Sequence, residues 1–459
     1  MDRSTQYPAH LAKLVAQRLQ RDVGRSPPEH VLVRLFETLY FTSFKTDEGR
    51  RIRCTVNFVD PADATGLVPA RAPADRWNYV RLEHVLPLDV RTLAKLARAA
   101  DPEISSLAVY ADDEGELYVW GLVDQEPRHG DRITLETDSA SQRPGLFQAT
   151  IGGTGNVSVY HNSTLLGNLA QSVLVETHYD VLWSGPVHIL LSQYLDGYLA
   201  EHCPALAVAC GSPDAKHLER ELLLRWLNSL SRVLVNIRHY HQGGGILMTP
   251  RSGFENVDVK YPIRYDRLIR SLVGLVRAHF LRNRGIESLR AAMDEDSRDS
   301  LQTVMSYLRD VHNELEERKN ELLGAARFIA SLSCVDGVVL LDREMIVHGF
   351  GVELRTDNDL RDVYMAGDAQ AEGGRLRRVD LTHFGTRHRA MMRYCHLHPG
   401  ALGFAVSQDG DIQAMTRIGA RLVVWENIDV QLAFKPDNWF TGTHDLAPIL
   451  RRISLRVES

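Results

Sequence analysis

The chain has 459 residues, of which 44% are hydrophobic and 24% charged, and its formal net charge is -6. This length predicts two or three domains with buried cores, and the composition is that of an ordinary soluble protein. The negative charge argues against a protein that coats nucleic acid, and no apolar run approaches the length of a membrane span. Five scattered cysteines, without a zinc motif or a signal-peptide core at the start, predict a protein of the reducing cytoplasm.

The first 180 residues predict an α+β module. Apolar residues at helical spacing predict a helix over 8–23, and a helix followed by strands is expected over 30–59. Within that second segment, Tyr40–Phe44 and Arg53–Phe58 flank the turn residues Asp47–Gly49, a pattern typical of a hairpin. Further elements are expected as a helix over 88–100 and as strands over 107–110, 117–120 and 156–160.

From about residue 186 the pattern becomes helical. Helices are predicted over 186–209, 216–240, 264–282 and 297–332. The last of these keeps the spacing of an apolar stripe, which Arg318 breaks. A stripe of this length is interpreted either as the face of a helix lying on its own domain or as a helix–helix contact in a dimer.

The C-terminal third alternates strands with one helix. Strands are predicted over 337–342, 346–354, 402–407, 411–415 and 421–425, with a helix over 386–397. The glycine run Gly243–Gly245 leads into one more strand; it lacks the lysine of a nucleotide phosphate loop and is interpreted as a turn. The polar segment 356–380 is interpreted as an exposed loop insertion.

A basic cluster, Arg387-His388-Arg389, follows Gly385-Thr386 at the start of the predicted helix 386–397. Thr386 is expected to cap this helix, so the cluster falls on the first turn. Two arginines flanking a histidine suit phosphate oxygens, and the helix dipole adds to their attraction. Basic residues at the start of a surface helix are also common without any function. The N-terminal end of a helix is nevertheless unfavourable for cations unless an anion binds there.

An acidic motif, Asp336-Gly337, stands at the mouth of the predicted strand 337–342. A carboxylate in this place can bind a divalent ion or receive a hydroxyl proton, and a glycine lets a flat group approach the backbone. Asp-Gly is also a common turn sequence. By itself the motif therefore does not indicate a function; it does so only in combination with the basic cluster.

A metal site is the other interpretation of the histidines near the basic cluster. The candidate ligands are Cys395, His396 and His398, together with His383 and His388. Residues two apart on a helix end point away from each other, and there is no second cysteine pair. A helix end with solvated histidines is the preferred interpretation.

In order along the chain, these motifs resemble the diadenylate cyclase (DAC) domain family, to which the catalytic domain of the DNA-integrity scanning protein DisA belongs. Gly385–Ala390 is similar to the family's Gly-Thr-Arg-His-Arg-Ala stretch without a substitution. Asp336-Gly337 is similar to its Asp-Gly-Ala motif, with Val338 in place of alanine. Val406–Gln408 and Gly244–Leu247 resemble two of its strands, so the resemblance covers roughly 216–455.

The resemblance implies a mixed central sheet flanked by helices and a defined reaction. Two ATP molecules are condensed into cyclic di-AMP plus pyrophosphate across a head-to-head homodimer or larger homo-oligomer, with Mg²⁺ or Mn²⁺. Asp336 would act at the 3′-hydroxyl and the metal, and Arg387, His388 and Arg389 would be catalytic at the triphosphate. The implied nucleotide-binding residues are Gly337, Val338, Gly385, Thr386, Ser407 and Arg421, with Arg417 as an alternative to the last.

The expected organisation has three parts. Residues 1–180 resemble the probable sensor modules that are fused to DAC domains in some bacteria. Residues 181–215 form a helical connector, and 216–459 form the DAC-like domain with a helical insertion over 263–330. No membrane or nucleic-acid partner is expected.

Two departures from the family pattern leave an alternative open. Val338 is bulkier than alanine, and Gln408-Asp409-Gly410 stands where other branches carry Glu-Glu-Thr, so only Asp409 could replace that carboxylate ligand. A degenerate domain that binds ATP or a cyclic dinucleotide without turnover is therefore the second hypothesis. An oligomerising scaffold built on helix 297–332 is the third.

Overall fold

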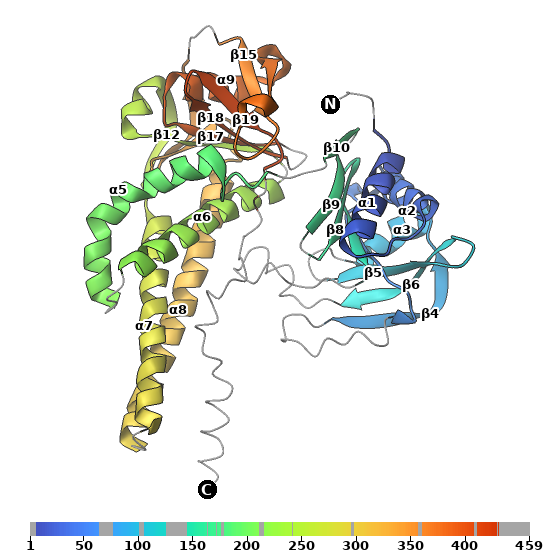
Figure 1. Ribbon diagram of the computed structural model, residues 1–459, viewed down its shortest axis with the longest axis horizontal. Helices are drawn as coiled ribbons and strands as arrows, with labels where there is room; N and C mark the ends of the chain where they lie inside the picture. Colours follow the sequence, from blue (N-terminus) through green and yellow to red (C-terminus); the bar gives the residue numbers. More distant parts are fainter. Residues whose placement is uncertain are drawn as a thin grey trace. The chain divides into compact units, whose positions relative to one another are not determined.

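The computed structural model describes most of the chain as two compact units. The first unit consists mainly of the residues up to Tyr179, and the second mainly of those from Asp180 onward (Figure 1). Each unit contains a mixed sheet with helices, which confirms the predicted fold class. The described residues are 6–63, 77–100, 105–124, 145–162, 164–170, 172–175, 179–210, 215–240, 242–294, 298–356, 360–407, 411–428 and 430.

The first unit is built on an eight-stranded sheet in the order β10-β9-β8-β7-β3-β5-β6-β4, beside a short hairpin β1-β2. Strands β3 and β5 are parallel, and the other neighbours in the sheet are antiparallel. Its helices are α1 (Pro8–Asp22), α2 (Glu29–Thr42) and α3 (Val90–Leu96). Its strands are β1 (Thr46–Asp47), β2 (Arg50–Arg51), β3 (Cys54–Phe58), β4 (Asn78–Pro87), β5 (Ser105–Ala111), β6 (Leu117–Asp124), β7 (Phe147–Gly153), β8 (Asn156–His161), β9 (Thr164–Ala170) and β10 (Val173–Val175).

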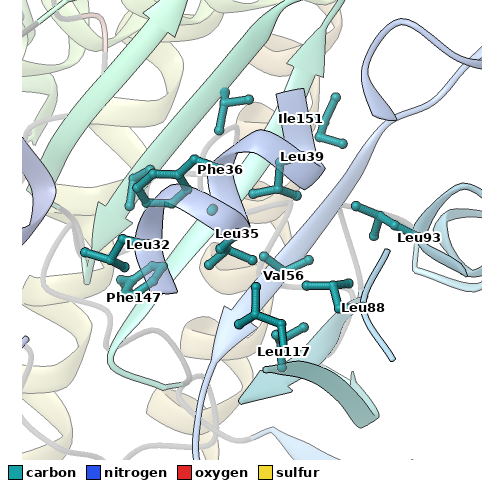
Figure 2. Packing of buried hydrophobic residues seen from close by; sticks show 14 of the residues in the cluster. Leu32, Leu35, Phe36, Leu39, Val56, Leu88, Leu93, Leu117, Phe147 and Ile151 are labelled. Carbon is teal, nitrogen blue, oxygen red and sulfur yellow. The ribbon is translucent and has the colours of Figure 1, made fainter. Parts of the chain in front are cut away.

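Helix α2 supplies much of the core of this unit. Leu32, Leu35, Phe36 and Leu39 recur at helical spacing, and all four are fully buried. Figure 2 shows them packed together with side chains from the sheet, among them Phe147. The amphipathic pattern therefore fixes which face of α2 covers the strands.

One predicted hairpin strand is wrong. Tyr40–Phe44 was expected to be a strand, but the first part of this segment is the last turn of α2, which ends at Thr42. Its aromatic residues favour strands in isolation, yet the burial of Phe36 and Leu39 extends the helical stripe to this point. The hairpin forms later, where Thr46–Asp47 pairs with Arg50–Arg51.

Replacing Phe36 with alanine is expected to lower the free energy of unfolding of this unit by about 3–5 kcal/mol, because a fully buried ring leaves a cavity. Phe41 is the matched control, since it lies on the same helix and is 55% exposed. Phe41→Ala should cost less than about 1 kcal/mol. Urea unfolding of both variants checks the difference; equal costs would contradict this packing.

The second unit is built on a nine-stranded sheet in the order β12-β14-β13-β11-β17-β18-β19-β15-β16. The pairs β11–β13 and β15–β19 are parallel, and the other neighbours are antiparallel. Its helices are α5 (Gly185–Cys210), α6 (Ala215–His239), α7 (Arg267–Asp294), α8 (Arg298–Leu332) and α9 (Thr386–Leu397). Its strands are β11 (Gly244–Met248), β12 (Val257–Tyr265), β13 (Val338–Leu341), β14 (Val347–Leu354), β15 (Asp362–Ala366), β16 (Leu376–Asp380), β17 (Leu402–Val406), β18 (Ile412–Ile418) and β19 (Arg421–Trp425).

Helix α8 packs against α7 and α6 within one chain, and Figure 1 shows α7 and α8 running side by side. Its C-terminal half is the more buried part, where Leu322, Ala326 and Ile329 are inaccessible to solvent. This arrangement matches the interpretation of a helix lying on its own domain. A dimer contact through α8 stays a prediction.

Several buried polar side chains lie where α6 faces α7. Glu221 and Arg225 of α6 form a buried ion pair, with Arg225 Nε donating to Glu221 Oε1 at 2.7 Å. His279 of α7 makes a 3.1 Å hydrogen bond through Nε2 with Asn283. Burial, and secondarily the Arg225 charge, lowers the pKa of His279 to about 4, so the folded protein holds this histidine neutral.

The free energy of unfolding should therefore fall as the pH drops from about 6.5 to about 4. The unfolded chain takes up a proton at His279 in this range while the folded chain does not, and the loss reaches about 3 kcal/mol. His279→Gln removes this term, so its stability should depend less steeply on pH. Urea unfolding across the range checks this result, and the exposed His383→Gln variant should keep the full slope.

The segment 356–380 is not a loop insertion. It contributes β15 and β16, which pair with each other and attach to the sheet through β19. Val363 and Met365 of β15 are buried, whereas arginines face solvent on β16. The strands were not predicted because an edge hairpin carries many polar residues, which resemble those of a loop. Residues Asp357–Asp359 of this segment lie outside the described residues.

Among the described residues, no helix combines the length and the apolar character that crossing a bilayer requires.

Candidate active site

Three strands in the middle of the second unit's sheet bring separate motifs to one edge. The N-terminal ends of the parallel strands β11 and β13 lie beside the C-terminal end of the antiparallel strand β17. Gly337 directly precedes β13, Ser407 directly follows β17, and Gly244 begins β11. The register thus places three segments with widely separated sequence positions at the same edge.

Helix α9 packs on this sheet through Met391, which is fully buried. A Cβ atom on Gly245 would lie 2.9 Å from Met391 Cε, and one on Gly403 would lie 2.6 Å from its sulfur. Only glycine at these strand positions allows the helix to approach so closely. The contact fixes the position of the first turn of α9.

The N-cap of α9 lies one residue earlier than expected. Gly385 is the N-cap residue, no side chain caps the helix, and Thr386 is the first helical residue, so the expectation of a Thr386 cap is wrong. Thr386 instead lies 3.4 Å from Arg389 Nη2, which donates to its hydroxyl. The first backbone N–H groups of a helix have no partner inside it, so this turn offers donors to an anion.

The acidic and basic motifs are in contact. Arg387 Nη2 donates to Asp336 Oδ1 at 2.8 Å, and the backbone N–H of Gly337 donates to the same oxygen at 3.0 Å. The Asp336 side chain is 99% exposed and that of Arg387 is 35% exposed. The structure therefore brings together the two motifs at the surface, where a soluble ligand can reach both.

The electrostatic surroundings keep Asp336 ionised. The hydrogen bond and charge of Arg387 lower the pKa of the Asp336 carboxyl below its usual range, and the Gly337 N–H and Lys260 add to this. A carboxylate with a lowered pKa is a weak base but remains available as an oxygen ligand at neutral pH.

His388 and Arg389 complete the first turn. His388 is half-buried, and burial followed by the charge of Arg387 lowers its pKa, so its imidazole is neutral at pH 7. The cationic charge of the motif at this pH is therefore carried by the two arginines. Three adjacent residues thus provide two charged donors and one neutral group.

Two glycines allow the backbone to close tightly behind Asp336. Gly337 has a φ of +113°, and a Cβ on it would lie 2.6 Å from the carbonyl carbon of Gly351 in β14. Gly351 has a φ of +62°, and a Cβ there would lie 3.0 Å from the ring of Tyr261. This close packing holds the backbone of Asp336 against the neighbouring strand.

Sequence reasoning missed two neighbours on β12. Lys260 is near enough to affect Asp336 electrostatically, and its Nζ lies 5.6 Å from the centre of the Tyr261 ring. Tyr261 stacks on Phe350 at 4.9 Å between ring centres but remains 42% exposed. The sequence of β12 alternates apolar and polar residues, which can indicate a strand. This pattern does not reveal that the strand lies beside Gly351 of β14.

The side chains of two predicted nucleotide-binding residues make other contacts within the chain. The Val338 side chain is 2% exposed and belongs to the core between the sheet and α9, 2.9 Å from the place of a Cβ on Gly245. Arg421 pairs with Ile418 at the opposite ends of the strands from Ser407, and its guanidinium stacks over Tyr364 at 5.0 Å. The expectations for Gln408–Gly410 lie outside the described residues.

The described residues contain no group of three or more side chains suited to hold a metal ion. The thiol of Cys395 is buried in the core, which raises its pKa to about 12. A divalent ion at Asp336 would therefore take one carboxylate from this part of the chain. Mg²⁺ is often held in this way, by one or two carboxylates and by substrate phosphates.

Comparison with known proteins gives one match, and it falls in the first unit. No curated protein matches the chain. A search of family models detects no diadenylate cyclase catalytic domain. Residues 21–124, which run from the end of α1 through β6, match the family described as probable sensor domain DACNV.

Proposed function

We propose that the second unit is a diadenylate cyclase and that the first unit is its sensor. The observation that carries this proposal is the 2.8 Å contact between Arg387 and Asp336. The two residues belong to motifs that resemble the two signatures of the DAC family. Their contact brings a carboxylate, a guanidinium and the N–H groups of an uncapped helix start to one exposed sheet edge, where they can position and stabilise phosphate groups.

In the proposed reaction, the 3′-oxygen of each ATP forms a bond to the α-phosphorus of the other. The 3′-hydroxyl loses its proton to solvent, the bond between that phosphorus and the oxygen bridging to the β-phosphate breaks, and pyrophosphate leaves. Two such steps close the ring of cyclic di-AMP. Arg387, Arg389 and the first N–H groups of α9 bind the phosphate oxygens and stabilise their developing charge. A triphosphate competes with Asp336 for the guanidinium of Arg387, which leaves the carboxylate to face the 3′-hydroxyl.

Asp336 is the residue that would hold a divalent cation at this site, together with the phosphates of a bound nucleotide. The exposed carboxylate of Asp336 is ionised at neutral pH and is an oxygen donor of the kind that Mg²⁺ and Mn²⁺ prefer. When bound, the cation would supply neutralisation of phosphate charge. Lys260 and Arg387 supply further positive charge from the protein itself.

Tyr261 is the candidate platform for the adenine base. It is exposed, it is supported from below by Phe350, and it lies against Gly351 near Asp336. Base stacking on an aromatic ring contributes about 1–3 kcal/mol per base. In this proposal Tyr261 takes the contact role that the sequence had suggested for Val338.

Cyclisation of two nucleotides needs two such sites facing each other, so the active form is proposed to be a head-to-head homodimer or a larger homo-oligomer. Each chain contributes one Asp336–Arg387 site on an exposed edge. The match of residues 21–124 to a probable sensor domain of the DACNV kind supports the regulatory part of the proposal.

A second candidate function is nucleotide binding without turnover. It is favoured by Val338, whose extra bulk relative to alanine lies in the layer between the sheet and α9 and can shift the first turn of that helix. Arg387, Arg389 and the first N–H groups of α9 would then hold ATP or a cyclic dinucleotide as a signal.

The deciding experiment incubates the full-length protein with ATP and either Mg²⁺ or Mn²⁺ and separates the products by chromatography. Cyclic di-AMP and pyrophosphate are expected at micromolar protein concentrations. Calorimetry that shows ATP binding without either product would favour the second function. Neither binding nor product, with either metal and at high protein concentration, would overturn both.

A further inference from the structure

A cavity of about 510 Å³ opens on the first unit, and nothing in the cyclase proposal uses it. It lies beyond the C-terminal ends of the parallel strands β3 and β5, where Asp60 and Asp112 follow their strands. Its size is that of a small-molecule site, and the carboxyl ends of adjacent parallel strands are a common place for one.

One wall of this cavity is apolar and aromatic. Phe58 and Trp77 contribute rings, and Phe58 is held by stacking on Phe147 with 5.2 Å between ring centres. The indole N–H of Trp77 is buried, with the phenol of Tyr79 as its neighbour. A bound molecule with an apolar body would complement this wall.

The rest of the lining carries an excess of negative charge. Among the described residues, four carboxylates line the cavity, those of Asp60, Asp63, Asp112 and Asp113, against one guanidinium. That guanidinium, of Arg25, lies 3.7 Å from Asp63 and offsets one of the four charges.

Two histidines, His30 and His161, also line the cavity. His161 Nδ1 lies 2.7 Å from the carbonyl oxygen of Leu146, and Nε2 lies 3.2 Å from the amide nitrogen of Asn162. Apart from the Arg25–Asp63 pair, the described lining holds the carboxylates of Asp60, Asp112 and Asp113, which can attract a cation.

The turn after β5 carries two of these carboxylates, Asp112 and Asp113. Asp112 Oδ1 accepts the backbone N–H groups of Glu114 and Glu116 at 3.0 and 2.8 Å, which fixes the loop. Asp113 is exposed at the cavity rim in the same turn. The Asp112 carboxylate is thus positioned by the backbone of its own turn.

We propose that this cavity binds a small organic amine, with its ammonium group at Asp112 and Asp113 and its apolar body against Phe58 and Trp77. If the first unit is the sensor of the proposed function, this site is where its signal binds. The assignment itself concerns binding alone, so it stands or falls independently of the chemistry at Asp336.

The test uses calorimetry on the full-length protein at low salt with three probes that differ only in their terminal group. These probes are tyramine, its neutral alcohol analogue tyrosol, and the carboxylate 3-(4-hydroxyphenyl)propionate. Tyramine is expected to bind with a dissociation constant below about 1 mM, and the other two at least about tenfold more weakly. Raising the salt concentration should weaken tyramine binding.

Two variants locate the site. Asp113→Asn removes a charge at the cavity rim and should weaken tyramine binding at least about fivefold. Glu114→Gln is the matched control, since it removes a charge from the next residue of the same exposed turn, outside the cavity lining, and should change binding less than about twofold. Failure of tyramine to bind, equal binding of the three probes, or equal effects of the two variants would overturn the proposal.

Discussion

Arg387→Ala should lower the rate of cyclic di-AMP formation by at least about 100-fold, because it removes a charged donor from the transferred phosphate. The same change frees Asp336 from its partner, which should raise the pKa of that carboxyl toward its usual range. Arg387→Lys keeps the charge but loses the planar fork of donors, so an intermediate loss of about tenfold is expected. Product formation from ATP, measured by chromatography, gives the rates.

The matched control is a second exposed Arg–Asp pair in the same unit. Arg378 of β16 pairs with Asp362 of β15, several strands away from β13 in the sheet. Arg378→Ala should leave the rate unchanged, and neither variant should change the free energy of unfolding by more than about 1 kcal/mol. Full activity in Arg387→Ala, or an equal loss in Arg378→Ala, would contradict the proposed role.

Gly337→Ala should lower the free energy of unfolding by about 2–4 kcal/mol and also lower product formation. Its φ of +113° is unfavourable for any side chain, and the added Cβ would lie 2.6 and 2.7 Å from backbone atoms of Gly351 and Val352. Because backbone atoms cannot rotate away, the chain carrying Asp336 must move. Chemical denaturation and the activity assay measure the two effects.

Gly324→Ala is the control for Gly337→Ala, because it makes the same change at a glycine whose surroundings can accept a side chain. Gly324 lies on the exposed face of α8, and a Cβ there would meet nothing within 4 Å. Alanine is the better helix former, so this change should stabilise the protein by about 0.5–1 kcal/mol. A similar loss of stability in both variants would refute the strained backbone at Gly337.

The sequence predicted most helices and strands because their apolar residues follow one period over many residues. Helix 297–332 differs from α8 by a single residue at its start. The failures occur where short segments carry conflicting signals. Tyr40–Phe44 has the composition of a strand but continues the buried stripe of α2, and the strands within 356–380 form a polar edge hairpin.

The candidate site was predictable only in part, for a different reason. The chemistry of Arg387 and Asp336 is visible in the sequence, but their contact depends on how β13 and α9 pack on the same sheet. The place of Arg421 depends on strand register, which neither composition nor spacing reveals. Tyr261 could not be found at all, because an exposed ring acquires meaning only from the residues beside it in space.

The order of strands in the second sheet has a consequence for how the protein forms during synthesis. Strand β11 is made before α7 and α8, yet both of its neighbours, β13 and β17, are made after them. The helix pair can associate through local contacts soon after it emerges, whereas the central strand must wait for partners much later in the chain. We therefore expect the first unit to fold while the ribosome is still extending the second, with the sheet edge that Gly337 and Ser407 flank completed last.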